Sequence, residues 1–257
     1  MLRSMNDLLG FTIGATDGDI GTIKEFYFDD VSYAVRYVVV DTGNWLAERK
    51  VLLSPIAFRV VDWDKRRIMA ALTKAQVEKS PDIDTHKPVS RQHETEYYGY
   101  YDYTPYWEGS YLWGGSPYPY YGSGPALGEA ELERERQWIR EAKSRDNPHL
   151  RSSKEVAGYH VEATDGEIGH VEDYLLDRET WAIRYMVVET SNWWAGKKVL
   201  VAPDWIKGVD WDQSKVRMTV TRAQIENSPT YDPNQPVERA YEAKLHGYYG
   251  QPYYWGG

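Results

Sequence analysis

Short runs of alternating hydrophobic and polar residues, separated by turn sequences, fill most of the chain and predict a protein made mainly of β-strands. Strands are expected near residues 9–15, 19–30, 34–41 and 50–55, followed by a hairpin over 58–72 that turns at 64–66. One short helix is expected after Thr73, a typical N-cap residue, and Pro81 ends it. About six short strands and one helix favour a small closed barrel, because closure removes exposed strand edges.

The same pattern occurs twice, at an offset of 148 residues. Residues 4–107 match residues 152–255 at 42 of 104 positions without a gap. ATDGDIG at 15–21 returns as ATDGEIG at 163–169, and AVRYVVVD at 34–41 returns as AIRYMVVE at 182–189. Similarity of this extent predicts two tandem copies of one fold.

Each copy carries an Asp-Gly turn followed by a second glycine. Asp-Gly supplies the positive φ angles of a type I′ hairpin turn. The apolar positions after the turn lose their alternation near the second glycine, which predicts a β-bulge there. The residues assigned to these structural turns are Asp17, Gly18, Gly21, Asp165, Gly166 and Gly169.

Two segments of different composition separate the copies. Residues 94–128 are rich in Tyr, Gly and Pro and contain no Lys or Arg, which predicts a low-complexity linker without a core of its own. The next segment mixes Glu with Lys and Arg at helical spacing, which predicts a solvated helix that either docks weakly through Leu132 and Ile139 or only spaces the two barrels. The predicted plan is barrel 1 (1–93), aromatic linker (94–128), charged helix (129–147), barrel 2 (148–240) and a Tyr-rich tail (241–257).

Charge and composition exclude several classes of function. The formal net charge is −9, which disfavours nucleic acid as a partner because phosphate contacts need clustered cations. The absence of cysteine excludes disulfides, thiol catalysis and Cys-based metal sites. No apolar run approaches the ~20 residues of a membrane span or resembles a signal peptide, so a soluble, cytoplasmic protein is expected.

The search for reactive groups predicts no catalytic, cofactor-binding or metal-binding residue. None of the six histidines aligns with another histidine at the repeat offset, which argues against a duplicated His-based site. The segment 86–96, HKPVSRQHETE, is expected to be a solvated linker and not a metal cluster. The repeated carboxylates are assigned to turns. No Gly-rich phosphate loop and no nucleophile elbow is found, so the protein is not expected to be an enzyme.

Two kinds of residue are candidates for interaction. The mid-strand arginines either form a salt bridge, with Asp29 and Asp177 or with Asp41 and Glu189 as partners, or belong to an interface. The tryptophans in the loop before the 50–55 strand and its copy either cap the open end of a barrel or anchor a partner. The candidates are Arg36, Trp45, Arg184, Trp193 and Trp194.

Four elements occurring in order, twice, resemble the PRC-barrel family. They are LLGFTIGATDGDIGTIKEFYFDD, AVRYVVVDTG, KVLLSP and TKAQVEKSP, with their copies in the second repeat. The resemblance implies two small β-barrels that dock onto other proteins, as in the cytoplasmic domain of the photosynthetic reaction-centre H subunit and in a ribosome maturation factor. It carries no catalytic residue set. The chain is similar to stand-alone bacterial proteins described as reaction-centre H-like.

These observations favour a non-catalytic adaptor, in which two linked barrels raise avidity for protein partners. A scaffold that self-associates through its Tyr-rich tracts is the alternative. A small-ligand carrier, an RNA- or ribosome-associated factor and a reaction-centre H-like component are weaker hypotheses. The partner itself is not predicted.

Overall fold

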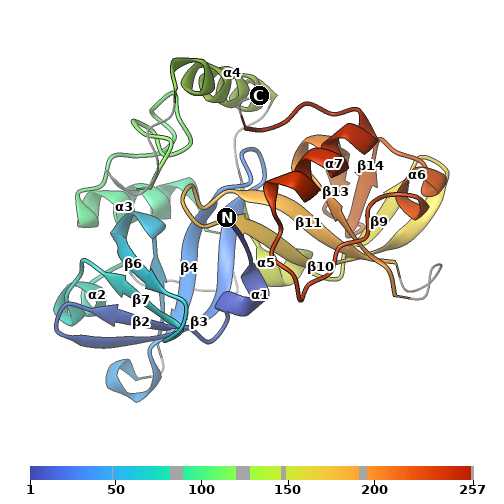
Figure 1. Cartoon of the computed structure of the whole chain (residues 1–257). Helices are drawn as coiled ribbons and strands as arrows, with labels where there is room; N and C mark the ends of the chain where they lie inside the picture. The colour runs from blue at the N-terminus through green and yellow to red at the C-terminus, as the bar shows by residue number, and fades with distance from the viewer. Residues whose placement is uncertain (48, 82–88, 120–127, 146–148, 191–195, 256–257) are drawn as a thin grey trace. The chain divides into compact units, whose positions relative to one another are not determined.

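The computed structural model describes residues 1–47, 49–81, 89–119, 128–145, 149–190 and 196–255, with 138 and 141–145 described by their backbone alone. The chain forms two compact units, each built on a seven-stranded sheet (Figure 1). The repeat-1 unit comprises residues 8–153 and 179–182. The repeat-2 unit comprises residues 1–7, 154–178 and 183–257.

The sheet of the repeat-1 unit follows the order β5-β4-β3-β2-β7-β6, and β8 pairs with β3 beside this path. Neighbours are antiparallel except β2 and β7, which run parallel. The strands are β2 (Thr12–Ala15), β3 (Gly18–Asp29), β4 (Val35–Asp41), β5 (Lys50–Leu53), β6 (Phe58–Asp62), β7 (Arg67–Ala70) and β8 (Leu150–Ser152). The helices are η1 (Gly43–Leu46), η2 (Pro55–Ala57), α2 (Lys74–Glu78), α3 (Arg91–Tyr101) and α4 (Glu129–Arg145).

The repeat-2 unit has the same sheet order, β12-β11-β10-β9-β14-β13, with β1 paired to β10. Its strands are β1 (Leu2–Ser4), β9 (His160–Ala163), β10 (Gly166–Asp177), β11 (Ile183–Glu189), β12 (Lys198–Val201), β13 (Ile206–Asp210) and β14 (Lys215–Met218). The helices are η3 (Pro203–Trp205), α6 (Arg222–Glu226) and α7 (Arg239–Tyr249), while α1 (Met5–Leu8) and α5 (Ser153–Val156) lie where the chain passes between units.

The predicted strands, the 58–72 hairpin and the helix capped by Thr73 are confirmed. Thr73 accepts from the Gln76 amide, and Gln76 reaches back to the Thr73 amide, which completes a capping box. Thr221 and Gln224 repeat this arrangement in α6. The mainly β class and the two barrel-like units follow the sequence analysis.

The predicted closure of each barrel is wrong. Among the described residues, β5 and β6 stand at the two ends of the sheet order and do not pair with each other. The two strands do not pair because η2 turns the chain between them. The Ser54 side chain caps the start of η2 by accepting a hydrogen bond from the Ile56 amide. The buried amide of Ser54 instead donates to the Tyr97 hydroxyl of α3, at 2.9 Å. A helix therefore covers the place where a closed barrel would continue its ladder.

Replacing Tyr97 with phenylalanine tests this role of α3. The change leaves the buried Ser54 amide without its acceptor, and we expect a loss of about 1–3 kcal/mol in the free energy of unfolding. Tyr100→Phe is the matched control, because the Tyr100 hydroxyl donates to Gln76 O at an exposed site. That control should change stability by less than about 0.5 kcal/mol. Urea unfolding of both variants decides the point, and equal losses would contradict it.

The Tyr-rich tract is part of the fold, because it begins inside helix α3. Its assignment as a linker without a core is therefore wrong. Residues 91–101 form α3, although 86–96 were expected to be solvated and 94–128 to lack a core. Tyr97, Tyr98 and Tyr106 are buried in a cluster with Tyr37 of β4. Tyrosine rings bury a large apolar area when the hydroxyl finds a polar partner, so a tract without aliphatic residues still packs.

The units also divide the sequence differently from the predicted domain plan, because the repeats exchange their first strands. Leu2 of β1 lies opposite Asp177 of β10, and Leu150 of β8 lies opposite Asp29 of β3. The two pairings are equivalent at the repeat offset. Residues 1–7 therefore complete the sheet of the repeat-2 unit, and residues 150–153 complete that of the repeat-1 unit.

The Asp-Gly hairpin forms in both repeats with a bulge at the expected place. Ile13 pairs with Gly21 and Gly14 with Asp19, so Ile20 is the extra residue. The predicted type I′ turn is wrong: neither Thr16 nor Asp17 has a positive φ, and Gly18 has φ 144° instead. The second repeat behaves in the same way, with Gly166 at φ 140° and Ile168 as the extra residue.

Both turn aspartates also cap the following short helix. Asp17 accepts from the Lys74 amide at 2.8 Å, and Asp165 accepts from the Arg222 amide at 2.7 Å. These bonds hold the first amide of α2 and of α6 against the hairpin, which explains why the aspartate recurs. The turn residues thus have a structural role in both units.

Candidate functional site

A buried ion pair lies at the centre of the repeat-1 unit. Arg36 of β4 and Asp29 at the end of β3 approach to 2.6 Å, with side-chain exposures of only 3% and 1%. Ser32 donates its backbone amide and hydroxyl to Asp29 and accepts from Arg36. A buried pair needs such additional hydrogen bonds, because desolvation of two charges otherwise exceeds their attraction.

A second buried carboxyl lies next to this pair. Glu94 of α3 accepts from the Tyr37 and Tyr106 hydroxyls, at 3.2 and 3.0 Å, and pairs with Arg91 at 2.9 Å. Burial raises the pKa of Glu94, while Arg91 and the two hydroxyls oppose the rise. The Arg36 guanidinium stacks over the Tyr106 ring at 3.8 Å, which joins the two buried acids in one polar cluster.

The repeat-2 unit contains the same cluster, residue for residue at the repeat offset. Glu242 of α7 accepts from the Tyr185 and Tyr254 hydroxyls, at 3.2 and 2.6 Å, and pairs with Arg239 at 3.0 Å. Arg184 lies over the Tyr254 ring at 4.4 Å. We call the two sets, Asp29, Arg36, Tyr37, Arg91, Glu94 and Tyr106, and Asp177, Arg184, Tyr185, Arg239, Glu242 and Tyr254, the repeat-1 and repeat-2 clusters.

The two clusters differ in what covers them. In the repeat-1 unit the Leu112 carbonyl accepts from Arg36 Nη1 at 2.6 Å, and the Trp113 ring lies 4.9 Å from the same guanidinium. Leu112 and Trp113 are both buried. In the repeat-2 unit the ion pair is looser, at 3.9 Å, and the Arg184 and Asp177 side chains are 24% and 12% exposed.

The covering segment of the repeat-1 unit is a tight turn held by its neighbours. Tyr111 and Gly114 exchange backbone hydrogen bonds, so Leu112 and Trp113 occupy the tip. The Leu112 amide donates to Glu135 of α4, and Trp113 Nε1 donates to Thr180 O at 2.8 Å. The predicted helix over 129–145 is confirmed as α4, and Ile139 on its expected docking face is buried.

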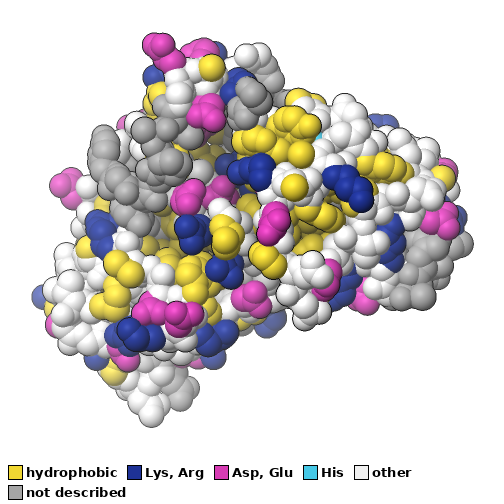
Figure 2. Space-filling view, viewed as in Figure 1, with side chains coloured by type: hydrophobic (Ala, Val, Ile, Leu, Met, Phe, Trp, Pro, Cys, Tyr) yellow, Lys and Arg dark blue, Asp and Glu magenta, His cyan; other side chains and the backbone are white. Residues whose placement is uncertain are grey.

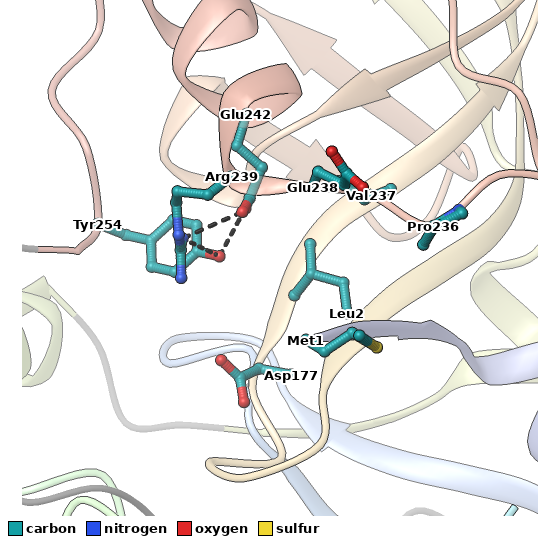
Figure 3. Close-up of a pocket in the computed structure, with 9 residues that line it drawn as sticks. All are labelled: Met1, Leu2, Asp177, Pro236, Val237, Glu238, Arg239, Glu242 and Tyr254. Carbon is teal, nitrogen blue, oxygen red and sulfur yellow. Dashed lines mark hydrogen bonds and ion pairs between the residues drawn. The ribbon is translucent and has the colours of Figure 1, made fainter.

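An open pocket of about 310 Å³ adjoins the repeat-2 cluster (Figure 3). Arg239, Glu242 and Tyr254 lie together on one side of it, and residues 236–238 lie on the other. Leu2 of the exchanged strand contributes to the wall, as does Asp177. The pocket thus combines an apolar wall with charged groups from the cluster.

A buried histidine of the repeat-2 unit predicts a pH dependence. His246 Nδ1 lies 2.7 Å from Pro252 O and Nε2 lies 2.9 Å from the Tyr185 hydroxyl. Burial lowers the His246 pKa below 6.5, although Glu242 and Asp204 oppose this. The unfolded chain takes up the proton near pH 6.5, so this histidine should reduce stability as the pH falls below that value.

His246→Tyr should remove that part of the acid sensitivity, since Tyr98 stands at the equivalent position of the first repeat. The free energy of unfolding, measured in urea from pH 7.5 to 5, should fall more steeply for the wild type than for this variant. His149→Tyr, at a position where the side chain is 59% exposed, is the control and should follow the wild type. Parallel pH profiles for all three proteins would contradict the assignment.

The structure shows the contacts of three of the five candidate residues. Arg36 forms the buried ion pair with Asp29, as one alternative proposed, and Arg184 forms the looser pair with Asp177. Trp45 is half-buried, its Nε1 donates to Ile20 O at 2.5 Å, and Lys74 Nζ lies 4.2 Å from its ring. That placement favours the capping role. Trp193 and Trp194 lie outside the described residues.

The sequence analysis missed Glu94, Glu242 and the tyrosines and arginines that bind them. Their signal was identity between the repeats, at positions that the predicted plan divided among the barrels, the linker and the tail. Within the described ranges, no group of three or more His, Asp or Glu side chains could hold a metal ion. The predictions on catalysis, cofactors and metals stay predictions.

Charges of both signs lie on the visible face of the molecule. Figure 2 shows Lys and Arg interspersed with Asp and Glu on the visible face, without a continuous basic surface there. A continuous basic surface is what nucleic-acid binding requires. No helix in the described part of the chain is long and apolar enough to cross a membrane.

The sheet order, the bulged first hairpin and the capped short helix define a small barrel-like β domain that occurs twice. Residues 3–77 match the family model of the PRC-barrel domain, and this part of the chain is a PRC-barrel domain. The second repeat has the same element order and sheet order. No curated protein matches the chain.

Proposed function

We propose that the protein is a non-catalytic adaptor that binds other proteins through the cluster face of its barrel units. One observation carries the proposal: in the repeat-1 unit this face already holds a short polypeptide turn, through Arg36 and the Leu112 carbonyl. The same residues recur in the repeat-2 unit beside an open pocket. We place this function in the cytoplasm of a bacterium, in line with the stand-alone proteins that the sequence resembles.

The bonding within the clusters supports binding over acid–base chemistry. Glu94 and Glu242 each accept two tyrosine hydroxyls and pair with an arginine. Carboxylates that accept these hydrogen bonds fix the shape of the surface around them. A general acid or base instead needs an oxygen that is free to bond its substrate. Self-association through free tyrosine tracts is less well supported, because Tyr97, Tyr98 and Tyr106 are buried.

Site-specific photo-cross-linking in native lysate tests the adaptor function. A benzophenone amino acid replaces Glu238, which is exposed at the pocket, and in a control protein it replaces Ser90, the exposed equivalent in the repeat-1 unit. We expect a discrete protein adduct from position 238 that is absent from position 90. Equal labelling at both positions, or turnover of a small substrate by the pure protein, would overturn the proposal.

A further inference from the structure

The two clusters can be compared as a site that a turn of its own unit covers and a site that is open. Asp29, Arg91 and Glu94 correspond to Asp177, Arg239 and Glu242, and the last three line the pocket. Tyr106 is buried in the first unit, whereas Tyr254 is half-buried in the second. Leu112 and Trp113 contact Arg36, and its counterpart Arg184 contacts the lining residues Asp177 and Tyr254. The turn that covers the first cluster therefore indicates what chemistry the second can hold.

The occupant of the first site has three recognisable features. It is a tight turn, it presents an aliphatic and an aromatic side chain at its tip, and it offers a backbone carbonyl to an arginine. Residues 109–118, GSYLWGGSPY, contain no charged side chain. An apolar pair beside one strong hydrogen-bond acceptor is the usual composition of a buried anchor at a protein interface.

The pocket of the repeat-2 unit offers matching chemistry. Leu2, Pro236 and Val237 supply apolar wall. Its volume, about 310 Å³, stands at the lower end of the ~300–1,000 Å³ typical of small-molecule sites and suits one or two side chains. Its lining carries three carboxylates, Asp177, Glu238 and Glu242, against a single arginine, which disfavours an anionic ligand and is compatible with a neutral segment.

We propose that this pocket binds a neutral turn of another protein that presents an adjacent aliphatic–aromatic pair, as Leu112–Trp113 does in the repeat-1 unit. The inference rests on the proposed adaptor function and names the partner's chemistry. The partner's side chains contact Leu2 and Val237, and its backbone carbonyl accepts from Arg184, which contacts the lining residues Asp177 and Tyr254. Arg184 remains beside Asp177 and Tyr254, just as Arg36 keeps Asp29 and Tyr106 while it bonds Leu112.

Binding of a synthetic peptide to the full-length protein tests the inference. The probe is GSYLWGGSPY, capped at both ends and fluorescently labelled, and fluorescence anisotropy reports its binding. We expect a dissociation constant between about 10 µM and 1 mM, because a short linear peptide must be ordered on binding. Replacing its Leu and Trp by Ala should weaken binding at least tenfold.

Variants of the protein locate the binding site of the peptide. Val237→Glu, and Pro236→Glu at an exposed position of the same wall, should each weaken binding at least tenfold. Val89→Glu, at the equivalent half-buried position of the repeat-1 unit, is the matched control and should leave binding unchanged. Urea unfolding checks that each variant is folded, and methyl NMR of the wild type should show peptide-induced shifts at Leu2 and Val237.

Two results would overturn the inference. One is the absence of binding, and the other is binding that ignores both pocket variants or the Leu–Trp pair. The adaptor function is tested separately, since a cross-linked partner at position 238 would stand even if the peptide fails. If the peptide binds at the pocket but position 238 gives no cross-linked protein, the adaptor function is contradicted and the specificity of the pocket stands.

Discussion

Replacing Arg36 with methionine is expected to destabilise the repeat-1 unit by about 3–5 kcal/mol, because it leaves the buried Asp29 carboxylate without its counter-charge. Arg36 also donates to Ser32 and to the Leu112 carbonyl, so the change removes hydrogen bonds in the same place. Methionine retains the length and the apolar stem of the side chain, which limits cavity formation. The loss is therefore assigned to charge and hydrogen bonding.

The second repeat provides the matched control. Arg184→Met removes a pair that is 3.9 Å apart and more exposed, so we expect a smaller loss than for Arg36→Met. Hydrogen exchange followed by mass spectrometry resolves the units separately, so protection of β4 reports on the first variant and protection of β11 on the second. Equal losses in the two units would contradict the difference in burial described above.

Gly21→Ala should destabilise the same unit by about 3 kcal/mol or more, because the added methyl group meets backbone. A Cβ at Gly21 would lie 2.0 Å from the carbonyl oxygen of Asp41. That oxygen belongs to the strand paired with β3, so relief requires separation of two strands. At Gly21, β3 and β4 therefore approach to a distance that only glycine permits.

Gly99→Ala controls for the general effect of adding a methyl group. Nothing lies within 4 Å of a Cβ at Gly99, which is inside α3. Alanine there should stabilise the protein by up to about 1 kcal/mol through its higher helix propensity. Thermal unfolding separates the opposite signs of the two changes. Tolerance of alanine at position 21 would show that β3 and β4 can move apart at little cost.

Local signals in the sequence predicted most of the sheet. Alternation of apolar residues placed the long strands, and the N-cap residue Thr73 placed α2, since both signals depend on neighbours along the chain. The pairing of β1 and β8 could not be found in this way, because each is three residues long and pairs with the other repeat. Barrel closure failed because the turn at Pro55 separates β5 from β6.

The site was predicted only in part. The arginine pair was found because an arginine among β-branched residues is unusual, and Asp29 was among its expected partners. Glu94 was missed because a glutamate in a polar, Tyr-rich segment gives no sign of burial. Its bonding depends on Arg91 one turn earlier and on two groups further away along the chain, Tyr37 and Tyr106, and only the identity of all four with the second repeat marked them.

The reciprocal pairing of β1 and β8 also bears on how such a chain can evolve. Neither half of the gene encodes a complete sheet, because each half supplies the strand that the other lacks. A single-repeat ancestor with this architecture would have obtained its seventh strand from a second copy of itself. Fusion of two copies makes that association intramolecular. It also frees one half to diverge, so that one cluster could become filled by its own chain while the other stayed open.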